Sequence, residues 1–168
     1  RPLPVVLALH GYGTTATGLA TAHAMNPHAN ANDYIVVYPQ GAGFYSKVAW
    51  QSDETLVSSW NDLASNVPTD AGPHCLPDRL DYPCYPECGD CKACDWTSCE
   101  DDVGFLLSIT QSVKESLHVD PDRFYLFGNS NGGGMVQRLG CDYPEHFAAV
   151  GIMIFQLAPG HACGPSET

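Results

Sequence analysis

The chain has 168 residues, which suits one domain, and 44% of them are hydrophobic, which is enough for a sizeable core. Only 15% are charged, and 19 acidic against 7 basic side chains give a formal net charge of −12. This balance argues against nucleic acid and anionic membrane surfaces as partners, because both would be repelled. No apolar run approaches the roughly 18 residues of a membrane span.

The first part of the chain predicts two buried strands. Residues 3–9 form a continuous apolar run that ends at His10 and Gly11, a pattern typical of a strand covered on both faces in a parallel sheet. Residues 14–32, rich in Ala, Thr and Asn, predict a helical stretch, and residues 34–38 predict the second strand. Both strands therefore belong in the interior of the fold.

The middle of the chain predicts little regular structure. Residues 41–73 are expected to be mostly loop, with Trp50 and Trp60 as large apolar anchors. An insertion rich in cysteine follows at about residues 74–101, and it holds six of the eight cysteines, Cys75, Cys84, Cys88, Cys91, Cys94 and Cys99. An even number of clustered cysteines favours disulfides formed in an oxidising compartment. Cys141 and Cys163 lie apart, and they pair with each other or with this cluster.

Two metal sites are weaker alternatives for this insertion. Cys88, Cys91 and Cys94 have the spacing of zinc ligands, and His74 lies nearby. A structural zinc usually takes two separated pairs of ligands, however, and here the cysteines are evenly crowded. The acidic residues of the loop suggest calcium, but no EF-hand-like spacing is present. The sequence therefore predicts disulfides and no metal.

The second half of the chain alternates helices and strands. Asp101 and Asp102 precede a helical stretch, where a carboxylate caps free N–H groups and favours the helix dipole. The predicted elements are a helix at 103–118, a turn at 120–123, a strand at 124–127, a helix at 133–141 and a strand at 147–157. This alternation predicts a mostly parallel α/β sheet with helices on both faces.

The strongest chemical signal is Gly128-Asn129-Ser130-Asn131-Gly132, between an apolar strand and a helix. A G-x-S-x-G segment in that context predicts a nucleophile elbow, a sharp turn that projects the serine above the sheet. The small residues allow close approach of the two backbones. The free N–H groups at the start of the helix favour a developing oxyanion. Ser130 is therefore the predicted nucleophile.

The loop after the first strand predicts the rest of an oxyanion hole. One donor of such a hole is the N–H of the residue after the nucleophile, here Asn131, and the other comes from a loop after an early strand. Gly11 and Tyr12 occupy that loop. His10 is expected to hold the loop rather than to act as a base. Tyr12 is also the aromatic side chain best placed to line a substrate pocket.

Five segments together form a pattern that is far more specific than the pentapeptide. They are Leu-His-Gly-Tyr-Gly at 9–13, Val-Val-Tyr-Pro-Gln-Gly at 36–41, Ser-Trp-Asn at 59–61, Asp-Asp-Val-Gly-Phe-Leu at 101–106, and the run from Val119 to Met135 that contains the elbow. This pattern resembles the polyhydroxybutyrate depolymerase and feruloyl esterase family of α/β hydrolases. The resemblance extends from Leu3 to about Val150 and omits the cysteine-rich segment.

The resemblance implies an extracellular serine esterase of the α/β-hydrolase fold. Ser130 would form the acyl-enzyme, and the N–H groups of Asn131 and of Gly11 or Tyr12 would hold the oxyanion. The implied substrates are feruloyl or acetyl esters of plant cell-wall polysaccharide, or a polyester such as polyhydroxybutyrate. No cofactor is implied.

The chain departs from the family after the nucleophile. In α/β hydrolases the acid and then the histidine follow the serine along the chain. Asp142, Glu145 and His146 are expected at the end of the nucleophile helix, away from the site, and His161 lies in the tail. We therefore expect a fold truncated at both ends, with the acid and base beyond Thr168. The alternative function is a non-catalytic binding or remnant hydrolase domain.

Overall fold

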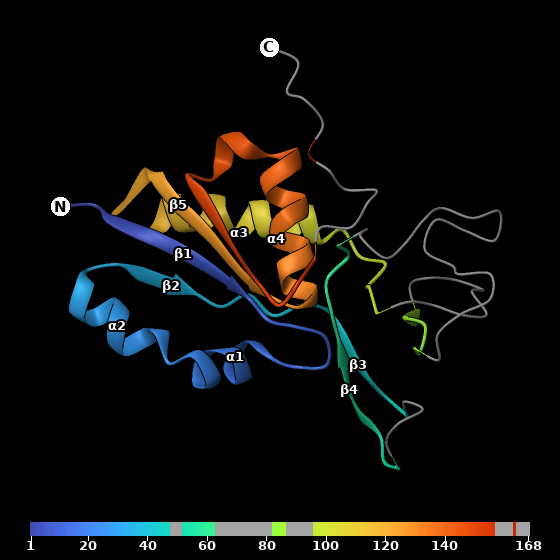
Figure 1. The fold of residues 1–168 in the computed structure, drawn as a ribbon. Helices are drawn as coiled ribbons and strands as arrows, with labels where there is room; N and C mark the ends of the chain where they lie inside the picture. Colours follow the sequence, from blue (N-terminus) through green and yellow to red (C-terminus); the bar gives the residue numbers. More distant parts are fainter. Residues whose placement is uncertain (48–51, 63–81, 87–95, 157–162, 164–168) are drawn as a thin grey trace.

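The computed structural model describes residues 1–47, 52–62, 82–86, 96–156 and 163 (Figure 1). Several predicted anchors and candidate ligands lie outside these residues: Trp50, His74, Cys75, Cys88, Cys91, Cys94 and His161. In the described residues no helix is both long and apolar enough to cross a membrane.

The main sheet has four strands in the order β2-β1-β5-β6. They are β1 (Leu3–Leu9), β2 (Ile35–Val37), β5 (Val119–Asn129) and β6 (Ala149–Met153), and every neighbouring pair is parallel. Parallel strands need crossover connections, which the helices between them supply. Because all four strands point the same way, the loops that follow β1, β2 and β5 meet at one edge of the sheet.

Helices cover both faces of this sheet (Figure 1). Helices α1 (Ala16–His23) and α2 (Met25–Asn32) lie on one face, where the ring of His23 packs on Phe127 at 5.4 Å. Helices α3 (Asp102–Ser116) and α4 (Asn131–Asp142) lie on the other. The predicted fold class, a mostly parallel sheet with helices on both faces, is confirmed.

The core lies between the sheet and the pair α3 and α4. Its buried apolar side chains come from alternate positions of the strands, from one side of each helix and from two connecting segments: Val5, Leu7, Leu9, Trp60, Val103, Leu106, Phe124, Leu126, Met135, Val136, Leu139 and Phe147. Trp60 is fully buried and is therefore an anchor, as predicted.

The prediction of mostly loop at residues 41–73 missed two strands in its described part. Strands β3 (Gly43–Ser46) and β4 (Thr55–Ser58) form an antiparallel pair beside the main sheet. Each strand has only four residues, and the pair buries Val57 against a small separate cluster with Tyr85. Such short strands leave little periodicity for a sequence pattern to reveal.

Three predicted boundaries also need correction. Residues 120–123 belong to β5, although the register shift between Leu3 and Val5 marks a bulge at this point. The Asp120 side chain accepts the N–H of Asp122 at 3.1 Å, a local bond typical of turns. Helix α4 begins at Asn131 rather than Gly133, and β6 is shorter than the predicted strand.

The cysteines that the structure describes all form disulfides. Cys141, at the end of α4, is bonded to Cys163, with the two Cα atoms 4.8 Å apart. Cys84 and Cys99, near the two ends of the cysteine-rich insertion, are each in a disulfide as well. For these four residues the disulfide interpretation is confirmed, because a bonded sulfur is no longer a thiolate ligand.

Candidate active site

Ser130 occupies a strained turn between β5 and α4. Its backbone has φ 53° and ψ −124°, a conformation that a residue with a side chain rarely adopts. The turn is held by the bond from Ser130 N to Met153 O at 2.9 Å and by the first helical bond, from Gly134 N to Ser130 O at 3.1 Å. The Ser130 side chain is exposed while its neighbours on α4 are buried. This is the geometry of a nucleophile elbow.

The two glycines of the elbow are required by contact with backbone atoms. A Cβ on Gly128 would lie 2.2 Å from Gly132 O. A Cβ on Gly132 would lie 2.4 Å from the carbonyl oxygens of both Leu9 and His10. Since backbone atoms cannot move aside as side chains do, both positions accept only glycine.

The loop after β1 lies directly against Ser130. A Cβ on Gly11 would lie 3.2 Å from Ser130 Cβ and 3.9 Å from Ser130 Oγ. Among the described residues, the backbone N–H groups of Gly11, Tyr12 and Asn131 have no acceptor, whereas the N–H of Gly13 donates to Ser58 O at 2.7 Å. The structure therefore brings together all four residues that the sequence singled out.

His10 is held by hydrogen bonds on both ring nitrogens. Nδ1 donates to Gly11 O at 2.8 Å, and Nε2 accepts the N–H of Gly41 at 3.0 Å, a pair of roles that requires the neutral ring. Burial lowers the pKa of His10, and the bond to Gly11 O opposes this shift. These contacts suit a residue that holds the loop after β1, and they leave no nitrogen for proton transfer.

Tyr12 lies at the base of a small aromatic cluster. Its ring meets Tyr82 edge to face at 5.2 Å and packs near Val57 and Tyr85. Burial, with a smaller contribution from Tyr82, raises the pKa of Tyr12 to about 12. The Tyr12 hydroxyl is buried and has no hydrogen-bond partner among the described residues. A phenol kept neutral in this way retains its proton at every physiological pH.

Asn131 contributes more than its N–H group. Its side-chain oxygen accepts the N–H of Trp60 at 2.8 Å, and its amide nitrogen donates to Trp60 O at 3.0 Å and to Asp62 Oδ2 at 2.9 Å. Asn131 is only 2% exposed, so these hydrogen bonds form away from water. They attach the residue after the nucleophile to the segment of residues 60–62.

The segment of residues 60–62 is the part of the site that sequence reasoning missed. Trp60 Nε1 also donates to His10 O at 2.8 Å, and Arg138 Nη1 donates to Asn61 O at 2.5 Å. One short segment thus contacts both the loop after β1 and helix α4. The Ser-Trp-Asn pattern at 59–61 is part of the resemblance, but nothing in it indicates Asp62.

The described candidates for the acid and base after Ser130 do not reach it. Asp142 ends α4 and lies 3.9 Å from Arg138, and His146 follows with Nε2 3.4 Å from Glu145. The helix has 12 residues and rises about 18 Å, so these groups lie at its far end, as predicted. Within the part of the chain that the structure describes, Ser130 Oγ has no hydrogen-bond partner.

The fold and the elbow together define the α/β-hydrolase class. The acetyl xylan esterase from Aspergillus awamori superposes with a TM-score of 0.50 at 17% identity, covering 90% of this chain and 41% of that enzyme. At this level of identity the likeness shows the fold alone. No family model matches the chain.

The sequence itself is similar to three curated proteins. NocK of Nocardia uniformis subsp. tsuyamanensis, whose name assigns it as an esterase, is 27% identical over 92% of this chain. A poly(3-hydroxybutyrate) depolymerase of Ralstonia pickettii is 44% identical over 30%, and feruloyl esterase B of Piromyces equi is 35% identical over 40%. The predicted resemblance to these two kinds of esterase is confirmed.

The chain spans only part of these relatives. It covers 33% of NocK, 11% of the depolymerase and 13% of the feruloyl esterase. The relatives therefore support an esterase domain, and the activity of the whole protein is a proposal.

Proposed function

We propose that this chain carries the nucleophile and oxyanion hole of a serine carboxylic-ester hydrolase. Ser130 Oγ attacks the ester carbonyl, the alcohol leaves, and water then releases the acid from the acyl-enzyme. The N–H groups of Gly11, Tyr12 and Asn131 stabilise the oxyanion in both steps. The general base and its acid partner are assigned to residues outside the described ones.

One observation carries this proposal. An exposed serine at a positive φ lies beside three backbone N–H groups that have no acceptor among the described residues. Unpaired N–H groups at a buried turn are unfavourable unless something else uses them. A developing oxyanion supplies that acceptor, and each such donor is worth on the order of 10²–10³ in rate.

We further propose a secreted protein with a polymeric or plant-derived substrate. The disulfides at Cys84, Cys99 and Cys141 support this proposal, because disulfides form and persist mainly in oxidising compartments. The matched relatives are named for poly(3-hydroxybutyrate) and feruloyl ester cleavage. The substrate classes are therefore a feruloyl or acetyl ester of cell-wall polysaccharide, and a polyester of the polyhydroxybutyrate type.

The test uses the protein at its complete natural length. It is treated with a fluorophosphonate, which labels activated serines, and the labelled peptide is identified by mass spectrometry. Hydrolysis of methyl ferulate, p-nitrophenyl acetate and polyhydroxybutyrate film is measured in parallel. Ser130→Ala is compared with Ser112→Ala, a matched change on the exposed side of α3.

The proposal predicts a label on Ser130 and loss of hydrolysis on the order of 10⁴- to 10⁶-fold in Ser130→Ala, with Ser112→Ala unchanged. The preferred ester among the three substrates then identifies the acyl group. Hydrolysis that survives Ser130→Ala contradicts the assignment of the nucleophile. An unlabelled protein with no turnover supports the alternative, a binding or remnant domain.

A further inference from the structure

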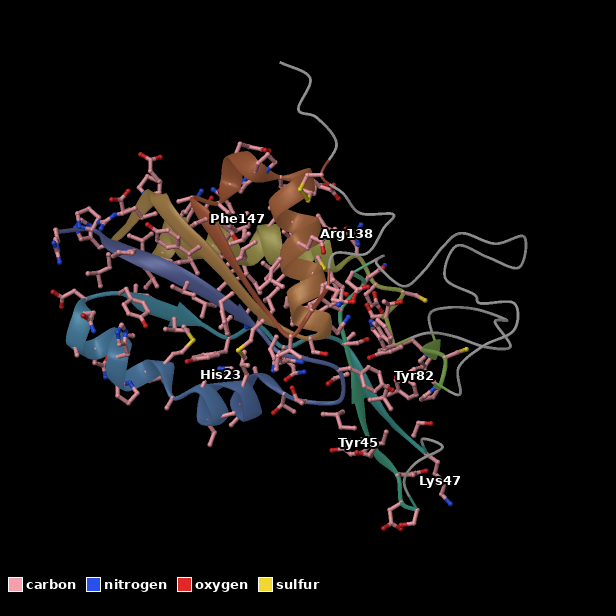
Figure 2. All side chains as sticks on the ribbon, in the orientation of Figure 1. His23, Tyr45, Lys47, Tyr82, Arg138 and Phe147 are labelled. Atoms are coloured by element: carbon pink, nitrogen blue, oxygen red, sulfur yellow. A yellow bond between two sulfur atoms is a disulfide. The ribbon has the colours of Figure 1, made fainter. Side chains whose placement is uncertain are left out.

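The two described pieces of the cysteine-rich insertion meet next to the elbow. Tyr82 comes from the first piece and Trp96 from the second, and their rings pack edge to face at 6.0 Å. Tyr82 also packs edge to face on Tyr12, at 5.2 Å. In Figure 2 Tyr82 lies beside the pair β3 and β4. The insertion therefore contacts one side of the proposed oxyanion hole.

The contacts from Tyr12 through Tyr82 to Trp96 continue to Asn131, on the other side of the proposed oxyanion hole. Trp96 Nε1 donates to Asp62 Oδ2 at 3.3 Å, and this oxygen also accepts the Asn131 side-chain amide at 2.9 Å. A continuous series of contacts thus runs from Tyr12 through Tyr82, Trp96 and Asp62 to Asn131. Both ends of the series are residues whose N–H groups have no acceptor in the described part of the chain.

Asp62 is placed to act on the first turn of α4. The residue is fully buried, and a Cβ on Gly134 would lie 2.7 Å from Asp62 Oδ2. A carboxylate near a helix N-terminus interacts favourably with the helix dipole. Because Oδ2 is shared between Trp96 and Asn131, a shift of the indole is transmitted to the residue that follows the nucleophile.

We infer that the cysteine-rich insertion is a positioning element for the oxyanion hole, acting through Tyr82 on the Gly11-Tyr12 loop and through Trp96 and Asp62 on Asn131. This inference rests on the proposed function of that hole. Misplacement of a reacting group by about 1 Å lowers the rate by roughly 100-fold, so small shifts of these donors affect the chemical step. Tyr82, Trp96 and Asp62 are positioning residues and do not touch the reacting atoms.

The insertion also makes a contact that serves as a matched control. Ser98, two residues after Trp96, donates its hydroxyl to Asp102 Oδ2 at 2.6 Å. This bond too joins the insertion to a buried carboxylate, but Asp102 belongs to α3, and its Oδ2 contacts the segment of residues 60–62 only through the N–H of Asn61, at 2.7 Å. Ser98→Ala therefore shows how far a weaker attachment of the insertion alone changes elbow exchange and activity.

The experiment compares four variants of the protein at its complete natural length. Trp96→Phe removes the indole N–H and keeps a ring against Tyr82, and Asp62→Ala removes the shared acceptor. Asp62→Asn is the conservative variant that keeps a side-chain oxygen, and Ser98→Ala is the control. Amide hydrogen exchange of the peptide over residues 128–134 is measured with kcat and KM for p-nitrophenyl acetate.

Trp96→Phe and Asp62→Ala are expected to raise elbow exchange about tenfold and to lower kcat roughly 10- to 100-fold, with KM changed less than about threefold. Asp62→Asn is expected to recover most of both properties, and Ser98→Ala to change both much less than Trp96→Phe does. Elbow exchange at the wild-type level in Trp96→Phe, or an equal increase in Ser98→Ala, overturns the inference. If Asp62→Ala does not fold, the result for Trp96→Phe alone tests the inference.

The two readouts separate this inference from the proposed function. A protein without Ser130-dependent hydrolysis contradicts the proposed function, yet elbow exchange still shows whether the insertion positions Asn131. If the protein hydrolyses esters but Trp96→Phe changes neither kcat nor elbow exchange, the proposed function is supported and the positioning role is overturned.

Discussion

The first turn of α4 lies among buried polar groups, whereas its last turn lies near the surface and is held by a disulfide. At the first turn, Asn131 forms three side-chain hydrogen bonds with residues 60–62, and Gly132 touches the backbone of β1. At the last turn, Asp142 is half exposed and Cys141 is bonded to Cys163. The same helix is therefore attached in two different ways.

This difference suggests separate roles for the two ends of α4: the first turn orients the elbow, and the last turn ties the helix to the rest of the chain. Several short directional bonds and backbone contacts fix the orientation of a peptide plane, which a nucleophile and an oxyanion donor need. A disulfide stabilises mainly by restricting the unfolded chain and sets orientation less tightly. Substitutions at the first turn are therefore expected to affect both stability and chemistry, and those at the last turn stability alone.

The largest contrast is expected between two glycines of α4. Gly132→Ala places a Cβ 2.4 Å from backbone oxygens of Leu9 and His10, so we expect a loss of more than about 4 kcal/mol or no folded protein. In Gly140→Ala the nearest atom, 3.0 Å away, is a methyl carbon of Val150. The gain in helix propensity offsets that contact to within about 1 kcal/mol. Urea unfolding of both variants tests this, and equal losses would contradict the comparison.

The next contrast is between the polar side chains at the two ends. Asn131→Ala removes three buried hydrogen bonds and leaves the Trp60 N–H without its acceptor, and we expect a loss of about 2–4 kcal/mol. Asp142→Ala removes only an ion pair of 3.9 Å to Arg138 with a half-exposed carboxylate, worth less than about 0.5 kcal/mol. Thermal or urea unfolding gives both values. A loss in Asp142→Ala as large as that in Asn131→Ala would show that the two ends are equivalent.

The disulfide is expected to have a smaller effect that is confined to stability. Replacement of Cys141 and Cys163 by Ser opens a link between residues 22 positions apart and lowers the free energy of unfolding by about 2–3 kcal/mol. Fluorophosphonate labelling of Ser130 in the folded fraction should keep its wild-type rate. A slower rate at a temperature where the variant is fully folded would extend the influence of the last turn to the elbow.

The parts of this molecule that the sequence predicted are those with a local cause. The apolar run of β1, the helix α3 after its Asp cap and the glycine-flanked Ser130 all depend on near neighbours in the chain. The support of the elbow depends on distant ones, since Trp60 and Asn131 are 71 residues apart. No periodicity encodes such a pairing, so Asp62 and the Asn131 side chain could be found only from the structure.

The smallest effect is expected from pH, through the loop that faces the elbow. Burial lowers the pKa of His10 below its ordinary value of 6.5, so the unfolded chain takes up a proton on this ring at a higher pH than the folded chain does. The free energy of unfolding therefore falls as the pH drops below about 6.5. Protonation also removes the Nε2 acceptor for the N–H of Gly41.

His10→Gln removes this proton uptake and is expected to flatten the dependence, although it lowers stability at pH 7.5. Urea midpoints of the two proteins between pH 7.5 and 5 measure the difference in slope. Parallel curves would mean that the loss at low pH arises at other groups. A steeper loss in the wild type would place the pH sensitivity of the fold at the loop after β1, which the backbone oxygen of His10 joins to Trp60, the partner of Asn131.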